Sequence, residues 1–192
     1  MISRLQSRHL LQRPVLLALS LMMAAWLPGE RALADPSKKE TFDFIATKVN
    51  QQGAVNVAGY LHDNATGKDS LTRESWEQTK FKIDPRQKCR MGYHKKITIN
   101  GNVSVDSDFW AALQGVQKVE VLPIEQAWKR FDARNGDTTL TYKADPPVTV
   151  VRLYVADGSY YDFAFYEKDL AERVGKAFEH AVDMCGGGKE AF

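Results

Sequence analysis

Hydrophobic residues recur at helical spacing near the two ends of the chain and alternate with polar residues between them. The first helical stretch, 37–52, opens on Ser37 and Glu40, which together form a capping box. The second stretch, 169–185, also begins with a capping-box pattern, and it carries one apolar stripe up to a run of three glycines. The pattern therefore predicts an N-terminal helix, and a C-terminal helix that buries one of its faces.

The alternating part of the chain is typical of half-buried strands. It predicts seven strands, in the ranges 54–62, 71–83, 89–99, 103–123, 138–143, 148–155 and 160–166. The apolar phase slips between Trp76 and Phe81, which predicts a β-bulge in the second strand. Asn100 and Gly101 favour a type I′ hairpin turn, and the helical spacing after Pro123 predicts a short helix before the fifth strand.

Residues 1–34 have the layout of a secretory signal. Three arginines form a basic start, the run 14–27 is almost wholly apolar, and Ala32-Leu33-Ala34 supplies the small residues that signal peptidase needs. An apolar run of 14 residues is shorter than the ~20 residues that span a bilayer. We therefore expect cleavage after Ala34 rather than an uncleaved membrane anchor. The product is a single exported domain, 35–192, that is periplasmic or secreted and not transmembrane.

Removing the signal changes the charge of the chain. The whole sequence carries 26 Lys and Arg against 24 Asp and Glu, and the signal holds four of the basic residues and one of the acidic ones. The mature chain therefore has a net charge of −1. This gives no support for nucleic-acid binding, because domains that bind nucleic acid are normally basic.

Two cysteines, Cys89 and Cys185, remain in a chain bound for an oxidising compartment. A disulfide between them is the simplest interpretation. Closing a loop of 96 residues would stabilise the fold by about 4–5 kcal/mol in the chain-entropy model. In the reduced state the cysteines, with nearby Met and His side chains, are also the soft ligands that suit Cu(I), but their spacing matches no common metal motif. We therefore predict the disulfide, with no metal and no cofactor.

The sequence lacks the commonest catalytic and nucleotide-binding motifs. It contains no Gly-rich phosphate loop, no zinc-protease or serine-hydrolase signature and no Cys-x-x-Cys pair. The three histidines of the mature chain, His62, His94 and His180, stand in no nucleophile motif. We therefore expect a non-catalytic binding or interaction module rather than an enzyme. Two alternatives stay open, a structural protein of the cell envelope and a small hydrolase without a recognisable motif.

One segment of the chain is strongly basic. Between residues 80 and 96 seven cations face one acid, Asp84, for a net charge of +6. Most of these cations have even numbers, so a pair of alternating strands would place them on one outward face. Such a face can hold an anionic lipid, polymer or protein partner in the cell envelope. The simpler interpretation is that exposed hairpins carry Lys and Arg to stay soluble and to prevent edge pairing.

The residues predicted to bind an anionic ligand are Lys80, Lys82, Lys88, Arg90 and Lys96. If they do so, reversing the charges of Lys88 and Arg90 should abolish binding. Reversal at Lys143 and Arg152, which lie outside the segment, should leave binding intact.

The order of the predicted elements resembles the pleckstrin-homology-like fold, in which a C-terminal helix caps two antiparallel sheets. The best local support is the spacing Leu113-x-x-Val116-x-x-Val119-x-Val121, which is similar to the central strand region of such domains. The resemblance implies a partly closed antiparallel barrel of about seven strands with a C-terminal capping helix. The predicted N-terminal helix departs from that pattern, and with it the expected fold is an α+β domain. The chain is also similar to small exported proteins of bacteria. Neither likeness transfers a site, because fold alone does not fix function.

Overall fold

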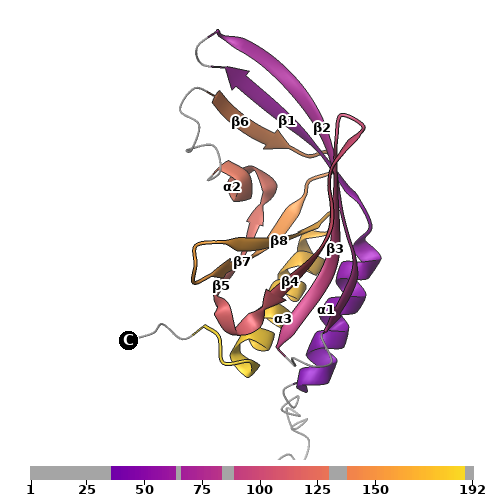
Figure 1. Cartoon of the computed structure of the whole chain (residues 1–192), viewed down its shortest axis with the longest axis vertical. Coiled ribbons are helices and arrows are strands. Elements are labelled where there is room, and N and C mark those ends of the chain that lie inside the picture. Colours follow the sequence, from indigo (N-terminus) through magenta and orange to yellow (C-terminus); the bar gives the residue numbers. More distant parts are fainter. Residues whose placement is uncertain (1–35, 64–65, 84–88, 130–137, 189–192) are drawn as a thin grey trace, which may run out of the picture. The chain divides into compact units, whose positions relative to one another are not determined.

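Eight strands in two antiparallel sheets, with three helices, make up the described part of the chain (Figure 1). The computed structural model describes residues 36–63, 66–83, 89–129 and 138–188. The helices are α1 (Lys38–Gln52), α2 (Ile124–Lys129) and α3 (Lys168–Met184). The strands are β1 (Val55–Asp63), β2 (Lys68–Ile83), β3 (Arg90–Ile99), β4 (Asn102–Ala112), β5 (Val116–Pro123), β6 (Thr138–Lys143), β7 (Thr149–Val155) and β8 (Tyr160–Phe165). The α+β class is confirmed, and the predicted signal, residues 1–34, lies outside the described residues.

The larger sheet is a four-strand meander extended by one later strand. Its order is β4-β3-β2-β1-β6, and the smaller sheet has the order β5-β7-β8. Asn100 and Gly101 connect β3 to β4 with φ angles of 50° and 84°, the left-handed pair that a type I′ turn requires. Figure 1 shows β1, β6 and the first part of β2 at the end of the larger sheet that lies away from α1 and α3, whereas the last part of β2 contacts α1. This sheet therefore has one end beside α1 and α3 and one end beyond them.

The two sheets are separate, which corrects the predicted partly closed barrel of seven strands. The segment 103–123, predicted as one strand, is divided by a single 3-10 turn, Leu113–Gly115, that leads the chain from β4 to β5. Leu113 is fully buried, and its backbone N–H donates to the carbonyl of Cys89 at 2.8 Å. No strand pairing joins the sheets among the described residues, so they do not close. The apolar spacing does not distinguish the two cases, because one bent strand and two strands joined by a turn bury the same positions.

Helix α3 packs on one face of the smaller sheet through the stripe that the sequence predicts. Phe178 and Ala181 are fully buried, and the Phe178 ring stacks on Phe163 of β8 with the ring centres 5.0 Å apart. Gly175 lets the helix come close, because a Cβ atom there would lie 2.6 Å from the Val121 side chain of β5. The helix and the smaller sheet therefore share one core.

The two long helices begin differently. In α1 the predicted capping box is confirmed, because the Glu40 N–H donates to Ser37 Oγ at 3.3 Å and the Ser37 N–H donates to the Glu40 carboxylate at 2.7 Å. In α3 the capping box predicted at Asp169 is wrong, because the N-cap is Glu167, which makes no side-chain capping bond. Burial of the apolar stripe, rather than a local cap, stabilises the start of α3.

The predicted disulfide is confirmed. Cys89 and Cys185 are bonded, with their Cα atoms 5.7 Å apart. The bond joins the residue before β3 to the residue after α3. It therefore holds the first residues of β3 against the end of the helix.

A β-bulge in β2 decides which of its side chains leave the core. The register with β3 shifts between Thr79 and Lys82, and Lys80 has a φ of 54°, which confirms the predicted bulge. Asn50 of α1 supports the bulge with two hydrogen bonds. Its amide oxygen accepts from the Phe81 N–H at 2.7 Å, and its NH₂ group donates to the Phe81 carbonyl at 3.2 Å. Phe81 is thereby buried and Lys82 is exposed.

The larger sheet has one face in the core and one face that no described element covers. On the inner face, Phe81, Met91 and Tyr93 belong to the main core cluster. We call the opposite face the outer face. It carries the residues that alternate with these, and none of them belongs to a core cluster of the described chain.

Candidate functional site: the outer face of the larger sheet

Four of the five predicted ligand-binding residues fall on the outer face or in the bulge beside it. They are Lys80, Lys82, Arg90 and Lys96. Lys88 lies outside the described residues. Lys95, from the same basic segment, points to the inner face, where its Nζ lies 4.6 Å from the centre of the Trp76 ring. Burial lowers the pKa of Lys95 below its ordinary value, and the charge of Asp162 opposes this shift only in part.

A tryptophan lies flat on the outer face. Trp110 of β4 is paired with Gly92 of β3. A Cβ atom on Gly92 would lie 2.7 Å from two carbons of the Trp110 ring and 2.9 Å from the next one. Three consecutive ring carbons at nearly equal distances mean that the face of the ring, and not its edge, covers the glycine. Any side chain at position 92 would displace the ring, so the glycine permits this arrangement.

Two cations flank this ring. Lys82 Nζ lies 5.5 Å from the centre of the Trp110 ring, and Arg90 Cζ lies 5.4 Å from it. Each contact of this kind is worth about 0.5–1 kcal/mol at an exposed site. No carboxylate of the described ranges lies at ion-pair distance from either cation. We call the group of Lys82, Arg90, Gly92 and Trp110 the Trp110 platform.

Next to the platform, His94 lies between two carboxylates of β4. Its Nε2 is 3.0 Å from Asp106 Oδ1, and its Nδ1 is 2.9 Å from Asp108 Oδ1. Both ring nitrogens can donate together only in the doubly protonated imidazolium. The hydrogen bond from His94 lowers the pKa of Asp108, and the positive charges of His94, Lys80 and Lys82 add to this effect. The two carboxylates therefore engage both ring nitrogens of His94.

The outer face is less basic than the segment 80–96 suggests. Strand β4 brings Asp106 and Asp108 beside β3, and Glu77 of β2 lies opposite Lys96. These acids lie outside the basic segment, and pairing of the strands brings them next to it. Lys80 and Lys96 also have no carboxylate of the described residues at ion-pair distance, and the Trp110 platform differs from them in holding two cations over one ring.

Sequence reasoning did not assign Trp110 to the site, although one signal was present. Gly92 interrupts an alternating strand, and a glycine in that position often marks a close approach by another group. The identity of that group depends on which residue of β4 lies opposite, which the register of the hairpin decides. A prediction of the platform therefore needed the exact pairing of two strands.

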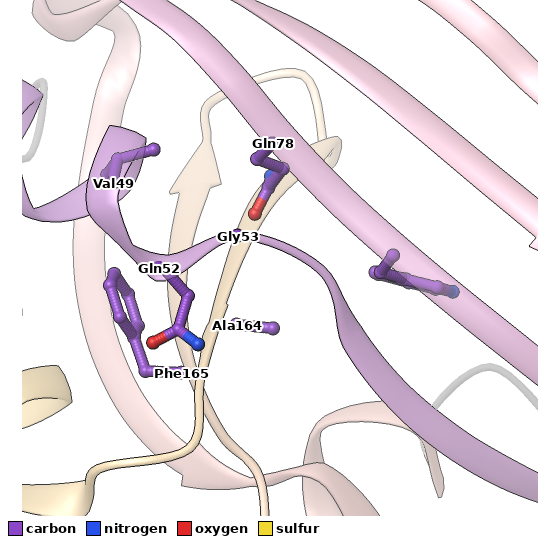
Figure 2. Close-up of a pocket in the computed structure, with 7 residues that line it drawn as sticks. Val49, Gln52, Gly53, Gln78, Ala164 and Phe165 are labelled. Carbon is purple, nitrogen blue, oxygen red and sulfur yellow. The ribbon is translucent and has the colours of Figure 1, made fainter.

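The crevice shown in Figure 2 offers no alternative site. It lies where the end of α1 meets β2 and β8. It is lined by Val49, Gln52, Gly53, Trp76, Gln78, Ala164 and Phe165. None of these side chains is charged, and the crevice leaves no room for a water molecule.

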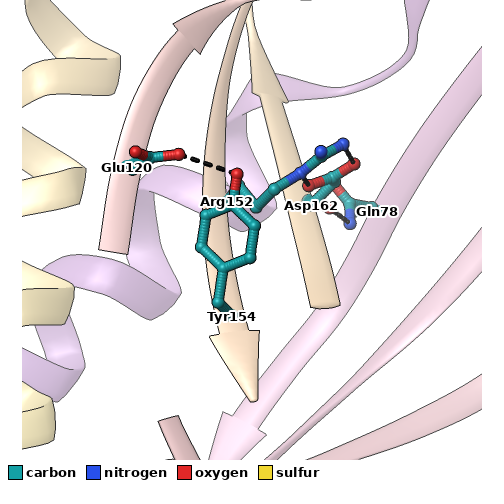
Figure 3. A network of polar contacts seen from close by, with 5 residues as sticks. All are labelled: Gln78, Glu120, Arg152, Tyr154 and Asp162. Atoms are coloured by element: carbon teal, nitrogen blue, oxygen red, sulfur yellow. Dashed lines mark hydrogen bonds and ion pairs between the residues drawn. The ribbon is translucent and has the colours of Figure 1, made fainter. Parts of the chain in front are cut away.

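A largely buried group of polar side chains on the smaller sheet is paired within the protein (Figure 3). Arg152 Nε and Nη2 each donate to an Asp162 carboxylate oxygen at 2.7 Å, and Gln78 donates to the Asp162 backbone carbonyl. The Tyr154 hydroxyl donates to Glu120 at 2.7 Å. Arg152 is 1% exposed, so it is not the surface cation that the sequence suggested as a control. A network whose donors and acceptors are satisfied in this way stabilises the fold.

The described residues also limit the kind of site that they can form. No three His, Cys, Asp or Glu side chains of these residues are grouped so that they could hold a metal ion, and the disulfide removes the thiolates of the alternative Cu(I) site. Among the same residues, no helix has the length and apolar character needed to cross a membrane.

No family model matches the chain, and the searches of curated proteins and of solved structures also find no match. The site is therefore interpreted from its own geometry.

Proposed function

We propose that the protein is a non-catalytic module that binds an anionic ligand of the cell envelope through the Trp110 platform. The observation that supports this most strongly is the placement of Lys82 and Arg90. Both lie beside an aromatic ring on an uncovered sheet face, with no carboxylate of the described chain at ion-pair distance. A negatively charged group of a ligand could bind there to two cations that are already held in position.

The neighbouring histidine argues for binding rather than catalysis. A general base needs a free ring nitrogen to accept a proton. Both nitrogens of His94 are engaged by Asp106 and Asp108. The His94 cluster therefore contributes to the charge of the face and offers no base.

We also propose that the domain is exported and resembles pleckstrin-homology-like domains in fold. The disulfide supports export, because such bonds persist in oxidising compartments. The four-strand meander β1–β4, the three-strand sheet and the final helix α3 support the relation in fold. Strand β6, which extends the meander, and the helix α1 are additions to that pattern.

Charge reversal at the platform tests the binding function. One double variant carries Lys82→Glu and Arg90→Glu. The control double variant carries Lys168→Glu and Lys176→Glu, which change the net charge equally on the exposed side of α3. Binding to polyglutamate and to phosphatidylglycerol vesicles is measured by co-sedimentation and fluorescence anisotropy at 0.01 M and 0.15 M salt.

We expect the platform pair to lose at least about tenfold in affinity at low salt and the control pair less than about twofold. Binding by the unchanged protein should weaken as the Debye length falls from ~30 Å to ~8 Å between the two salt concentrations. Equal binding by the two reversed pairs would contradict the proposal, and would favour a purely structural role.

A further inference from the structure

The shape of the Trp110 platform restricts the kind of ligand it fits. One face of the Trp110 ring covers Gly92. The charged groups of Lys82 and Arg90 lie 5.5 Å and 5.4 Å from the ring centre, whereas groups stacked in contact lie ~3.5–4 Å apart. Both cations lie over the ring at more than stacking distance, and Trp110 is partly exposed. The exposed part of the ring therefore lies next to two positive charges.

A second aromatic ring with a cation lies on the outer face near its other end. Tyr60 of β1 is 44% exposed, and Lys143 Nζ of β6 lies 5.5 Å from the centre of its ring. Tyr60 is paired with Leu71 of β2, and β1 and β6 lie at the end of the sheet away from α1 and α3 (Figure 1). We call Tyr60 and Lys143 the Tyr60 station. Lys143 is thus part of the outer face and not a neutral control position.

The strand register gives the spacing of the two sites. Leu71, beside Tyr60, and Lys82, beside Gly92, both lie on β2. Leu71 and Lys82 are eleven residues apart, and the bulge between Thr79 and Lys82 takes up one of these steps. The ten regular steps span about 33 Å along the strand at 3.2–3.4 Å per residue. A ligand that contacts both rings is therefore an extended chain, and a single small anion reaches only one of them.

From these observations, and resting on the proposed function, we infer that the ligand is an acidic polysaccharide. The C–H groups on the face of a sugar ring carry partial positive charge and pack against the negative face of an aromatic ring. Carboxylate or sulfate groups on the same sugars would reach Lys82, Arg90 and Lys143. A polymer of such sugars repeats a ring face and a negative charge along its length. The outer face offers an aromatic ring with a cation near each of its two ends.

Other anionic ligands fit these features less well. A membrane surface is bound by aromatic side chains that extend into the interface between lipid and water, whereas Trp110 lies flat on Gly92. An acidic peptide provides negative charge but no rigid ring to stack on Trp110. A chain of ring-shaped anionic units would contact both the flat indole and the distant Tyr60.

The test measures how affinity depends on chain length. The full-length exported protein is titrated calorimetrically with trigalacturonate, which reaches one ring, and with long polygalacturonate, which reaches both. The variants are Trp110→Ala, Trp110→Phe and Tyr60→Ala, and Leu71→Ala is the matched control, because Leu71 is 46% exposed beside Tyr60 and has no ring. Thermal melts check that each variant folds. Polyglutamate and phosphatidylglycerol vesicles serve as anions without sugar rings.

We expect long polygalacturonate to bind at least about tenfold more tightly than trigalacturonate, because the second contact forms within one complex. Tyr60→Ala should remove most of this gain and leave trigalacturonate binding unchanged. The control Leu71→Ala should leave the affinities for both ligands unchanged. Trp110→Ala should weaken both ligands, and Trp110→Phe should restore part of the affinity. Polyglutamate binding should not depend on Tyr60.

Two results would overturn the inference. In the first, polyglutamate or vesicles bind through Lys82 and Arg90, polygalacturonate binds no more tightly, and its affinity is unchanged by Trp110→Ala and Tyr60→Ala. The ligand is then another anion, and the proposed function survives. If no polyanion responds to Lys82 and Arg90, the proposed function fails together with the inference.

Discussion

Arg152 and Arg90 both lie over an aromatic ring, yet their surroundings are opposite. Arg152 Cζ is 4.1 Å from the centre of the Tyr160 ring, and its side chain is bonded through two nitrogens to Asp162. It is 1% exposed. Arg90 is partly exposed beside Trp110, with no carboxylate of the described residues at ion-pair distance. The same guanidinium group is thus fully compensated in the core and uncompensated on the surface.

The difference follows from the cost of removing a charge from water. A buried ion must find its partners within the protein, because the desolvation penalty is several kcal/mol. Burial alone would lower the pKa of Arg152, but the hydrogen bond and charge of Asp162 outweigh it, so that the pKa is raised. A surface cation keeps its hydration and needs no partner. An unpaired surface arginine therefore stays available to a ligand, whereas a buried paired one belongs to the fold.

The largest expected effect comes from breaking the buried pair. Asp162→Ala leaves the Arg152 charge buried and unpaired, and should lower the free energy of unfolding by about 3–5 kcal/mol. Arg90→Ala loses one exposed cation–aromatic contact, and should cost at most about 1 kcal/mol. Urea unfolding followed by circular dichroism measures both values.

A double variant sharpens the same comparison. Arg152→Met with Asp162→Leu removes both charges, and should recover most of the stability lost by Asp162→Ala, because a well-packed apolar pair can replace a buried ion pair. Similar losses for Asp162→Ala and Arg90→Ala would mean that burial does not separate the two arginines.

The features predicted correctly from the sequence are those that neighbouring residues decide. The capping box at Ser37, the turn at Asn100 and the bulge near Lys80 each depend on a few consecutive residues. The disulfide was predictable because only two cysteines are present. In these cases local chemistry leaves few alternatives.

The missed features depend on residues far apart in the sequence. Arg152 and Asp162 are brought together by the pairing of β7 with β8 and buried by packing against β2, and a single arginine in a strand gives no sign of this. Asp106 and Asp108 reduce the charge of the basic segment through the β3–β4 register. The predicted binding residues that the structure describes thus lie on the outer face or in the bulge beside it. The Trp110 platform could not be foreseen, because it requires the registers of both β2–β3 and β3–β4.

The two faces of β3 should also differ in their response to pH. Burial raises the pKa of Tyr93 on the inner face above its ordinary value, and the charges of Tyr161 and Asp162 add to this shift. The folded state therefore keeps the Tyr93 proton where the unfolded chain releases it. Stability is complete below the unfolded pKa of ~10 and falls as the pH rises above it, with a slope that approaches about 1.4 kcal/mol per pH unit.

Tyr93→Phe isolates this effect. The difference in unfolding free energy between the protein and the variant should change between pH 9 and pH 11, with the variant losing less stability. Other tyrosines titrate in both proteins, so their contribution cancels in the difference. Parallel stability curves over this range would show that Tyr93 is not protected from water.

The smallest effect is expected on the outer face at Asp108. Its pKa is lowered, first by the hydrogen bond from His94 and then by the charges of His94, Lys80 and Lys82. A lowered pKa stabilises the folded state above the unfolded value of ~3.9 and loses this contribution as the pH falls through the folded value. Because Asp108 is exposed, solvent screens the contribution and Asp108→Asn should leave stability almost unchanged.

The effect of Asp108→Asn on binding should be larger, because the substitution removes a negative charge next to Lys80 and Lys82. Affinity for polygalacturonate should rise about threefold at 0.01 M salt, and this gain should shrink at 0.15 M salt as screening increases. The control is Asp183→Asn on α3, which raises the net charge equally and should change affinity far less, since charge acts mainly within a Debye length. Weaker binding by Asp108→Asn would instead mean that the carboxylate holds His94 and its neighbours in the geometry that the ligand needs.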